Sequence, residues 1–171
     1  YGFDINNLKP YLYPTDDEIK QVGVTGIFLG SYVKWDIFKQ LELVKTLGFL
    51  ENEETKEGTY DKWENLDVYF TVFHDYFKFL KYGFGRTTDH VSIEIRYGRI
   101  TRKKGIELVK EYEGKIPRKY IKEFLKAAEI TEEEFHEICD KFTNKELFQT
   151  DQNGNLIKDE DENLTLKNDI L

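Results

Sequence analysis

The chain has 171 residues, a single cysteine and a formal net charge of −8. This length can bury a full core and is typical of one domain, with or without appendages. No apolar run approaches the roughly 20 residues of a membrane-spanning helix, one cysteine excludes an internal disulfide framework, and the acidic balance argues against a protein that coats nucleic acid. The sequence therefore predicts no membrane span, no nucleic-acid partner and a cytoplasmic location.

The first 50 residues predict a short helix, a strand and a second helix. Thr15 and Glu18 have the spacing of a capping box at the start of the first helix. Residues 24–30 form a short apolar run between glycines, rich in β-formers, which predicts a buried strand. Asp36 is a suitable N-cap for a helix whose apolar residues fall on one stripe. Strand, polar turn and helix is the order in which α/β enzymes place functional groups.

Residues 51–67 are polar and lack a period, so we expect a loop, with Tyr60 and Trp63 as anchors. A compact helical domain is expected over residues 68–142. Its first helix is dense in aromatic residues and carries one polar stripe, formed by Thr71, His74, Asp75, Lys78 and Lys81. That stripe points toward the helix break at Gly83 and Gly85.

Four further helices are predicted from their end signals. Thr87 or Thr88 is the expected N-cap of the first, and Thr101 of the second. The third opens at Pro117, and the fourth begins with a capping box at Thr131.

Residues 143–171 form a polar tail, in which Asn153-Gly154 is a strong hairpin signal before a loose end. Oxygen side chains at residues 151–162 partly match a calcium-binding loop, but leucine stands where its sharp turn needs glycine, so a plain hairpin is favoured. His136 and Cys139 have the spacing of two metal ligands without a second pair. We therefore predict no metal site.

Basic residues concentrate between His74 and Lys104, where eight lysines and arginines face three carboxylates. Such an island in an acidic chain indicates a local anionic ligand, a phosphate or carboxylate. Basic side chains that suit helix dipoles are the alternative. The glycines alone are a weak signal, but Lys78, Lys81 and Arg86 flank the expected start of a helix, whose free N–H groups attract anions.

Four segments together resemble one family. They are residues 32–36 (YVKWD), 78–88 (KFLKYGFGRTT), 95–102 (IRYGRITR) and 130–135 (ITEEEF). Their order is similar to that in the C-terminal half of the N-acetyl sugar amidotransferases of lipopolysaccharide O-antigen and flagellar nonulosonic acid biosynthesis, and the likeness covers about residues 8–142.

The resemblance implies a mainly α fold. A short strand–turn–helix remnant of an α/β ATP-pyrophosphatase (PP-loop) domain would occupy residues 1–50, before the loop, the helical array and the tail. The family's Ser-Gly-Gly-x-Asp-Ser loop is missing from this sequence. The ATP and Mg it implies are therefore expected mainly in an N-terminal half outside this chain, which has no methionine and would be an inactive piece of a longer protein.

The implied reaction converts a sugar N-acetyl group into an acetamidino group. ATP would adenylate the amide oxygen, and ammonia from a separate glutaminase subunit would displace AMP. The substrate would be an anionic or nucleotide-linked N-acetyl sugar. Its expected binding residues are Lys34, Asp36, Lys78, Lys81, Gly83, Gly85, Arg86, Thr87, Thr88 and His90. No catalytic residue is identified. Arg96, Arg99 and Arg102 are weaker candidates, and Arg86→Ala is expected to lower activity with the fold intact.

Two other functions fit the same sequence. The chain could be a non-catalytic helical docking module whose basic island recruits the acidic face of a glutaminase. RNA binding, as in tRNA-modifying relatives of the ATP-pyrophosphatase fold, is disfavoured by the acidic balance.

Overall fold

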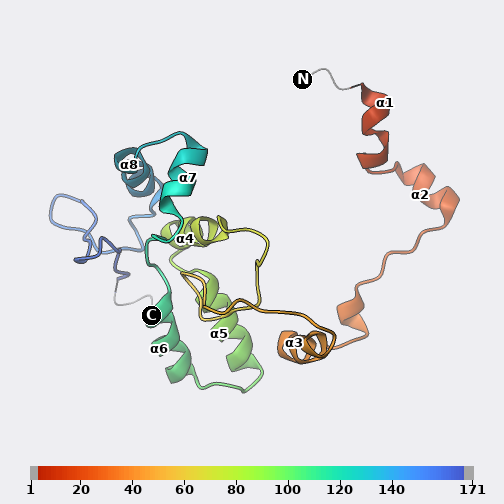
Figure 1. The fold of residues 1–171 in the computed structure, drawn as a ribbon, viewed down its shortest axis with the longest axis horizontal. Helices are drawn as coiled ribbons and strands as arrows, with labels where there is room; N and C mark the ends of the chain where they lie inside the picture. The colour runs from red at the N-terminus through yellow and green to blue at the C-terminus, as the bar shows by residue number, and fades with distance from the viewer. Residues whose placement is uncertain (1–3, 168–171) are drawn as a thin grey trace. The chain divides into compact units, whose positions relative to one another are not determined.

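The computed structural model describes residues 4–167 and is mainly helical, which confirms the predicted fold class (Figure 1). Its α-helices are α1 (Ile5–Leu8), α2 (Asp16–Val22), α3 (Ile37–Thr46), α4 (Thr71–Tyr82), α5 (Arg86–Arg96), α6 (Arg102–Tyr112), α7 (Ile121–Ala128) and α8 (Glu132–Phe142). Short 3-10 turns occupy Lys9–Tyr11 and Leu29–Ser31. Within residues 4–167, no helix has both the length and the apolar character needed to cross a membrane.

The chain divides into two compact units, residues 1–46 and 47–171. The loop that precedes α4 therefore belongs to the same unit as helices α4 to α8.

Local end signals organise the first unit as predicted. The Thr15 side chain accepts the Glu18 N–H, and the Glu18 carboxylate accepts the Thr15 N–H at 2.8 Å, which completes the capping box of α2. Asp36 Oδ1 accepts the Phe38 N–H at 3.2 Å, as an N-cap of α3 does.

The prediction of a strand at residues 24–30 is wrong. This segment is irregular and ends in the 3-10 turn Leu29–Ser31. Ile27 and Phe28, which a buried strand would hide, are 65% and 88% exposed. A strand needs a neighbouring backbone to accept its hydrogen bonds, and the described part of the chain contains only isolated bridges, all of them near the other end of the chain. Apolar content alone could not supply that partner.

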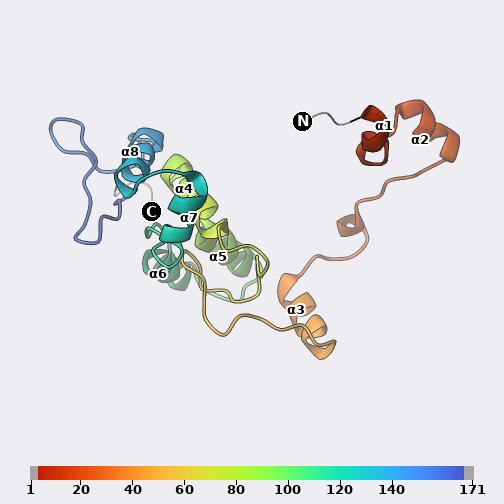
Figure 2. The ribbon, with the colours of Figure 1, turned by 45° about the horizontal axis from the view of Figure 1, so that its top comes forward.

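Helix α4 is the centre of the second unit. It buries Phe73, Phe79 and Leu80 almost completely, and α8 packs against it (Figures 1 and 2). Phe124 of α7 stacks on Phe73 with the ring centroids 4.1 Å apart, and Phe135 of α8 meets Phe73 edge-on. Large aromatic side chains bury much area in few residues, so this cluster is a substantial part of the hydrophobic core.

Helices α5 and α6 lie side by side and form a second packing layer (Figure 2). Gly105, in the middle of α6, makes this approach possible: a Cβ there would lie 2.9 Å from Ile95 Cδ1 of α5. Glycine lowers the helix propensity of this segment, but it allows the backbones of α5 and α6 to pack closely.

Gly114, just after α6, is the most constrained glycine of the second unit. Its φ is +78°, and a Cβ there would lie 2.5 Å from Phe79 Cζ in the core. We expect Gly114→Ala to lower the free energy of unfolding by about 2 kcal/mol or more, since a left-handed backbone and overpacking each cost about 1–3 kcal/mol. Gly98 has a similar φ of +68° in open space. Gly98→Ala is therefore the matched control, and equal losses in urea melts would contradict a role for Phe79.

In the second unit, threonine caps are confirmed at two of the three helix starts where they were predicted. The Thr101 hydroxyl accepts the Lys104 N–H, and Thr131 and Glu134 form the predicted capping box of α8. The third prediction is wrong, because Gly85 takes the N-cap position of α5 and Thr87 and Thr88 lie inside its first turn. The hydroxyls of both threonines bind more distant parts of the chain.

As far as Lys167, where the described residues end, the tail packs into the core and does not form the loose end expected after the hairpin. Phe148 is fully buried, and Leu164 and Leu166 are each 9% exposed. Two turns eight residues apart hold these side chains. In each, an aspartate Oδ1 accepts backbone N–H groups two and four residues later, with Asn155 closing the turn of Asp151 and Asn163 that of Asp159.

The first of these turns is the predicted hairpin turn. It is closed by the antiparallel bridge between Thr150 and Leu156, with no continuous strand in the described residues. Oδ1 of Asp151 accepts two backbone N–H groups and Oδ2 accepts the side-chain amide of Asn155. Its oxygens thus hold the turn together, as the side chain of an Asx turn does.

Candidate functional site

A network of charged side chains joins the loop at residues 57–67 to α4 and α5, and we call it the ionic centre. It comprises Asp61, Glu64, Asp75, Arg86 and His90. His90 Nδ1 lies 3.1 Å from Asp61 Oδ2, and His90 Nε2 lies 3.2 Å from Glu64 Oε2. Arg86 donates from Nε and Nη2 to the two oxygens of Asp75 at 3.1 and 3.0 Å, and from Nη1 to Glu64 at 3.0 Å. One helix end therefore fastens both a loop and a neighbouring helix.

Hydrogen bonds within the loop fix the two loop carboxylates. Asp61 Oδ1 accepts the N–H groups of Trp63 and Glu64 at 3.3 and 3.2 Å, so a tight turn carries Glu64 toward α5. The Thr59 hydroxyl donates to Asp61 Oδ2 at 2.7 Å. From the other side, the Thr87 hydroxyl of α5 donates to the Gly58 carbonyl at 2.8 Å. The loop is thus attached to α5 through both its backbone and its side chains.

Two aromatic side chains of the loop cover the imidazole of His90, as anchors were expected to do. Trp63 stacks on the ring with 6.3 Å between centroids, and Tyr60 meets it edge-on at 6.0 Å. The Tyr60 hydroxyl also donates to Glu94 of α5. These contacts remove water from the ionic centre and strengthen its electrostatic interactions.

The protonation of the ionic centre follows from these contacts. Burial opposes a charged imidazole, but hydrogen bonds to Asp61 and Glu64 outweigh it and raise the pKa of His90 to about 9. Burial likewise works against the charge of Asp61, yet hydrogen bonds from His90 and Thr59 lower its pKa overall. The hydrogen bond from His90 is the main reason why the pKa of Glu64 is also lowered. Asp61, Glu64 and His90 are therefore charged near neutral pH.

Asp61, Glu64 and His90 are also the one group of described residues whose ligand atoms come close enough to hold a metal ion, within 4.8 Å of one another. Their geometry fits a proton-bearing imidazolium better. Each ring nitrogen faces its own carboxylate, whereas a metal ion uses the lone pair of one nitrogen, and Arg86 donates to the Glu64 oxygen that a cation would need. The imidazolium of His90 and the guanidinium of Arg86 already supply positive charge to these carboxylates.

The start of α5, expected to bind an anionic ligand, binds a carboxylate of this chain. Glu113, at the end of α6, accepts the Thr88 N–H at 2.8 Å and the Thr88 hydroxyl at 2.7 Å. A Cβ on Gly85 would lie 3.2 Å from this carboxylate, so glycine here makes room for it. Burial raises the pKa of Glu113, although hydrogen bonds from Thr88 and Gly85 oppose that shift. The start of α5 therefore binds an anion, as helix starts commonly do, but this anion is the carboxylate of Glu113.

The structure places the predicted binding residues in different environments. Gly83, Gly85, Thr87 and His90 are buried, while Lys78, Arg86 and Thr88 are half-buried. Lys78 pairs with Asp89 at 2.5 Å. Lys81 is exposed at the end of α4, beside the ring of Phe142, and no carboxylate of the described residues pairs with it. Lys34, which is exposed, and Asp36, which is buried, belong to the first unit.

The structure changes the expected effect of the substitution Arg86→Ala. Arg86→Ala was expected to leave the fold intact, but the side chain neutralises two partly buried carboxylates. Removing the Arg86 side chain is therefore expected to destabilise the fold as well as to remove a cation.

Sequence reasoning missed Thr59, Asp61, Glu64 and Glu113. The Asp61-x-x-Glu64 spacing, in which an aspartate caps the turn that presents the next acid, was a usable signal. Glu113 carries no such signal, because its partner Thr88 lies 25 residues away.

Exposed basic residues gather where α5 ends and α6 begins. Arg96, in the last turn of α5, suits the helix dipole. Arg102, Lys103 and Lys104 occupy the first turn of α6, which has no acidic residue, and there the dipole disfavours them. Lys104 is partly offset by Glu107 at 3.6 Å. Helix-dipole compensation therefore explains Arg96 but not the basic turn of α6.

A comparison with protein-family models finds one match, over residues 57–160, described as the C-terminal domain of LPS biosynthesis protein WbpG-like. The match contains the whole ionic centre and the basic turn of α6. It begins at Glu57, so the first unit lies outside it. A comparison with curated proteins finds no match.

Proposed function

The chain belongs to the family of LPS biosynthesis proteins with a WbpG-like C-terminal domain, and from this premise we propose that it is the C-terminal part of an ATP-dependent N-acetyl sugar amidotransferase. The proposed reaction converts a sugar N-acetyl group into an acetamidino group during surface polysaccharide or flagellin glycan biosynthesis, including pseudaminic acid pathways, in the cytoplasm. The observation that carries the proposal is the ionic centre, which lies within the matched domain and fixes the predicted binding segment at residues 78–90 on a rigid base.

The ionic centre supports substrate binding by positioning rather than by direct contact. Its charges are paired within the chain, so they hold α4, α5 and the loop in one arrangement before a ligand arrives. Such preorganisation lowers the cost of binding. Lys81, exposed at the end of α4, remains available for an anionic or nucleotide-linked sugar.

We assign ATP and its magnesium ion to a PP-loop domain outside this sequence. The residues present here do not fit a nucleotide triphosphate, because the start of α5 already holds the Glu113 carboxylate, which would repel phosphate. ATP would supply activation of the amide oxygen, and a glutaminase subunit would supply ammonia. The role left to this chain is to bind and orient the sugar.

Lys81→Ala tests this role in the full-length protein. We expect kcat/KM for a nucleotide-linked N-acetyl sugar to fall about tenfold, since one charge-assisted hydrogen bond contributes about 1.5–3 kcal/mol. The thermal stability should hardly change, because Lys81 is exposed. Lys126→Ala, at an exposed lysine of α7, is the control. Equal activity of wild type and Lys81→Ala would remove Lys81 from the substrate site.

A second candidate function, docking of a glutaminase, is favoured by the basic turn of α6. Three cations at a helix start are unfavourable in isolation, and the acidic face of a partner would offset them.

Reversing this charge tests the docking function. Arg102→Glu with Lys103→Glu should keep or improve the stability of α6, because glutamate suits a helix start. Binding of the glutaminase, measured by calorimetry, should weaken at least tenfold while sugar binding stays unchanged. Lys122→Glu with Lys126→Glu, at two exposed lysines of α7, makes the same change of net charge and is the control. Retained partner binding would argue that the basic turn has another use.

A further inference from the structure

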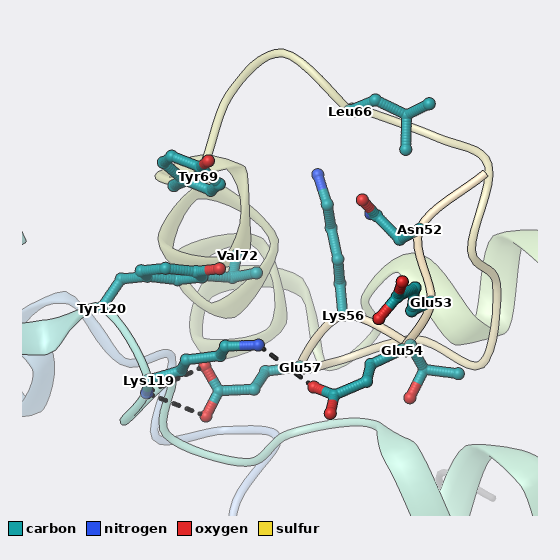
Figure 3. A pocket seen from close by; sticks show the side chains of 11 residues that line it. Asn52, Glu53, Glu54, Lys56, Glu57, Leu66, Tyr69, Val72, Lys119 and Tyr120 are labelled. Carbon is teal, nitrogen blue, oxygen red and sulfur yellow. Dashed lines mark hydrogen bonds and ion pairs between the residues drawn. The ribbon is translucent and has the colours of Figure 1, made fainter. Parts of the chain in front are cut away.

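A pocket of about 290 Å³ opens between the loop and the start of α4 (Figure 3). Three segments line it: residues 52–57 of the loop, the stretch from Leu66 to Val72 at the start of α4, and the pair Lys119-Tyr120 before α7. All of them belong to the second unit. Specific small-molecule pockets begin at about 300 Å³, so this volume suits one small ring rather than a whole nucleotide.

Charged groups at the base of the pocket are already engaged. Lys119 Nζ lies 3.2 Å from Glu54 Oε2, and the Glu57 carboxylate accepts the backbone N–H groups of Arg118 and Lys119 (Figure 3). Lys56 donates to the backbone carbonyl of Asn65. These bonds hold the three segments together, so the pocket is built before any ligand arrives.

The polar atoms that remain belong mostly to uncharged groups. The side-chain amide of Asn52 and the hydroxyls of Tyr69 and Tyr120 line the pocket, and these atoms make no hydrogen bond within the described residues. The two tyrosine rings stack on each other with centroids 4.9 Å apart, and Lys119 Nζ lies over the Tyr120 ring at 5.7 Å, so Tyr120 presents its edge and its hydroxyl to the pocket. Figure 3 shows the side chain of Lys56 between the tyrosines and the opposite side of the pocket, where Asn52 and Glu53 lie.

We propose that this pocket binds the ring of an N-acetylated sugar. A pyranose ring carries hydroxyl and amide groups at its rim that bond to an amide and to phenols, and its C–H groups can contact the edges of the aromatic rings. The Glu53 carboxylate accepts hydroxyl donors but would repel a phosphate, so the pocket selects the sugar over its anionic substituent. The choice of an N-acetylated sugar rests on the proposed function. The fit of a neutral sugar ring rests only on the residues that line the pocket.

The test is a titration of the full chain with methyl N-acetylglucosaminide, a probe without phosphate, followed by NMR of the ¹⁵N-labelled protein. We expect shift changes at the amides of residues 52–57, Tyr69 and Tyr120. Tyr69→Ala and Asn52→Ala should each weaken binding about tenfold or more. Tyr69 is 64% exposed and Asn52 lies in the loop, so folding can be retained and checked by circular dichroism. Tyr13→Ala removes a tyrosine that is 86% exposed in the first unit and is the matched control.

Several outcomes would contradict the proposal that this pocket binds a sugar. One is no binding of the probe to the wild-type chain, and another is binding that both variants retain. Shift changes at residues 78–90 in place of the pocket would move the sugar to the other site and leave the proposed function standing. Conversely, binding in the pocket together with a full-length protein that forms no acetamidino product would overturn the function and keep the sugar site.

Discussion

Arg86→Ala is expected to lower the free energy of unfolding by about 3–5 kcal/mol, because it leaves two carboxylates in a partly buried site without their cation. Asp75 and Glu64 are 11% and 25% exposed at their side chains, so water can compensate them only in part. Urea denaturation followed by circular dichroism measures the loss.

Two further variants separate charge from geometry at Arg86. Arg86→Lys keeps the charge but lacks the planar fork that donates to both oxygens of Asp75 and to Glu64, so it should recover only part of the stability. Lys81→Ala removes an exposed cation nearby in the sequence and should cost little. A full recovery by lysine would show that the fork of hydrogen bonds is unimportant.

His90 should make the stability of the second unit depend on pH. Its pKa is raised from 6.5 to about 9, so its contribution is complete below pH 6.5 and is lost as the pH rises through 9. The shift corresponds to roughly 3 kcal/mol for this buried side chain. At the acid end the sign reverses, because the lowered pKa values of Asp61 and Glu64 contribute stability that is lost as these carboxylates become protonated.

His90→Gln isolates this effect. Denaturation midpoints of wild type and variant, compared between pH 6 and pH 10, should converge as the pH rises, since the wild type loses the interaction that the variant lacks. His136→Gln is the control, because His136 is half-buried and only approaches Glu162 at 3.7 Å. A constant difference across this range would show that the imidazole does not lose its proton there.

The sequence predicted those parts of the fold that depend on neighbours along the chain. Thr101 and Thr131 cap their helices because a cap needs only its own first turn. The strand at residues 24–30 failed because a strand depends on a partner that the pattern cannot name. Gly85 replaced the threonines as N-cap of α5 because Glu113, far away in the chain, supplies the acceptor.

The candidate site divides in the same way. The segment at residues 78–90 was predicted from its charge and its glycines, and of its residues only Arg86 and His90 belong to the ionic centre. Their charges could not be assigned to internal partners, because Asp61 and Glu64 come from a loop without periodicity. A basic island in a sequence therefore indicates where anions bind but not whether they belong to the chain itself.

The buried tail sets the length at which this domain can be produced. The family match ends at residue 160, yet Leu164 and Leu166 belong to the core, and the Asn163 side chain accepts the N–H of Ile116 at 3.0 Å. An expression fragment cut at the end of the match would open the hydrophobic cluster beside Phe148 and invite aggregation. Fragments for crystallisation or labelling should therefore extend at least to Lys167.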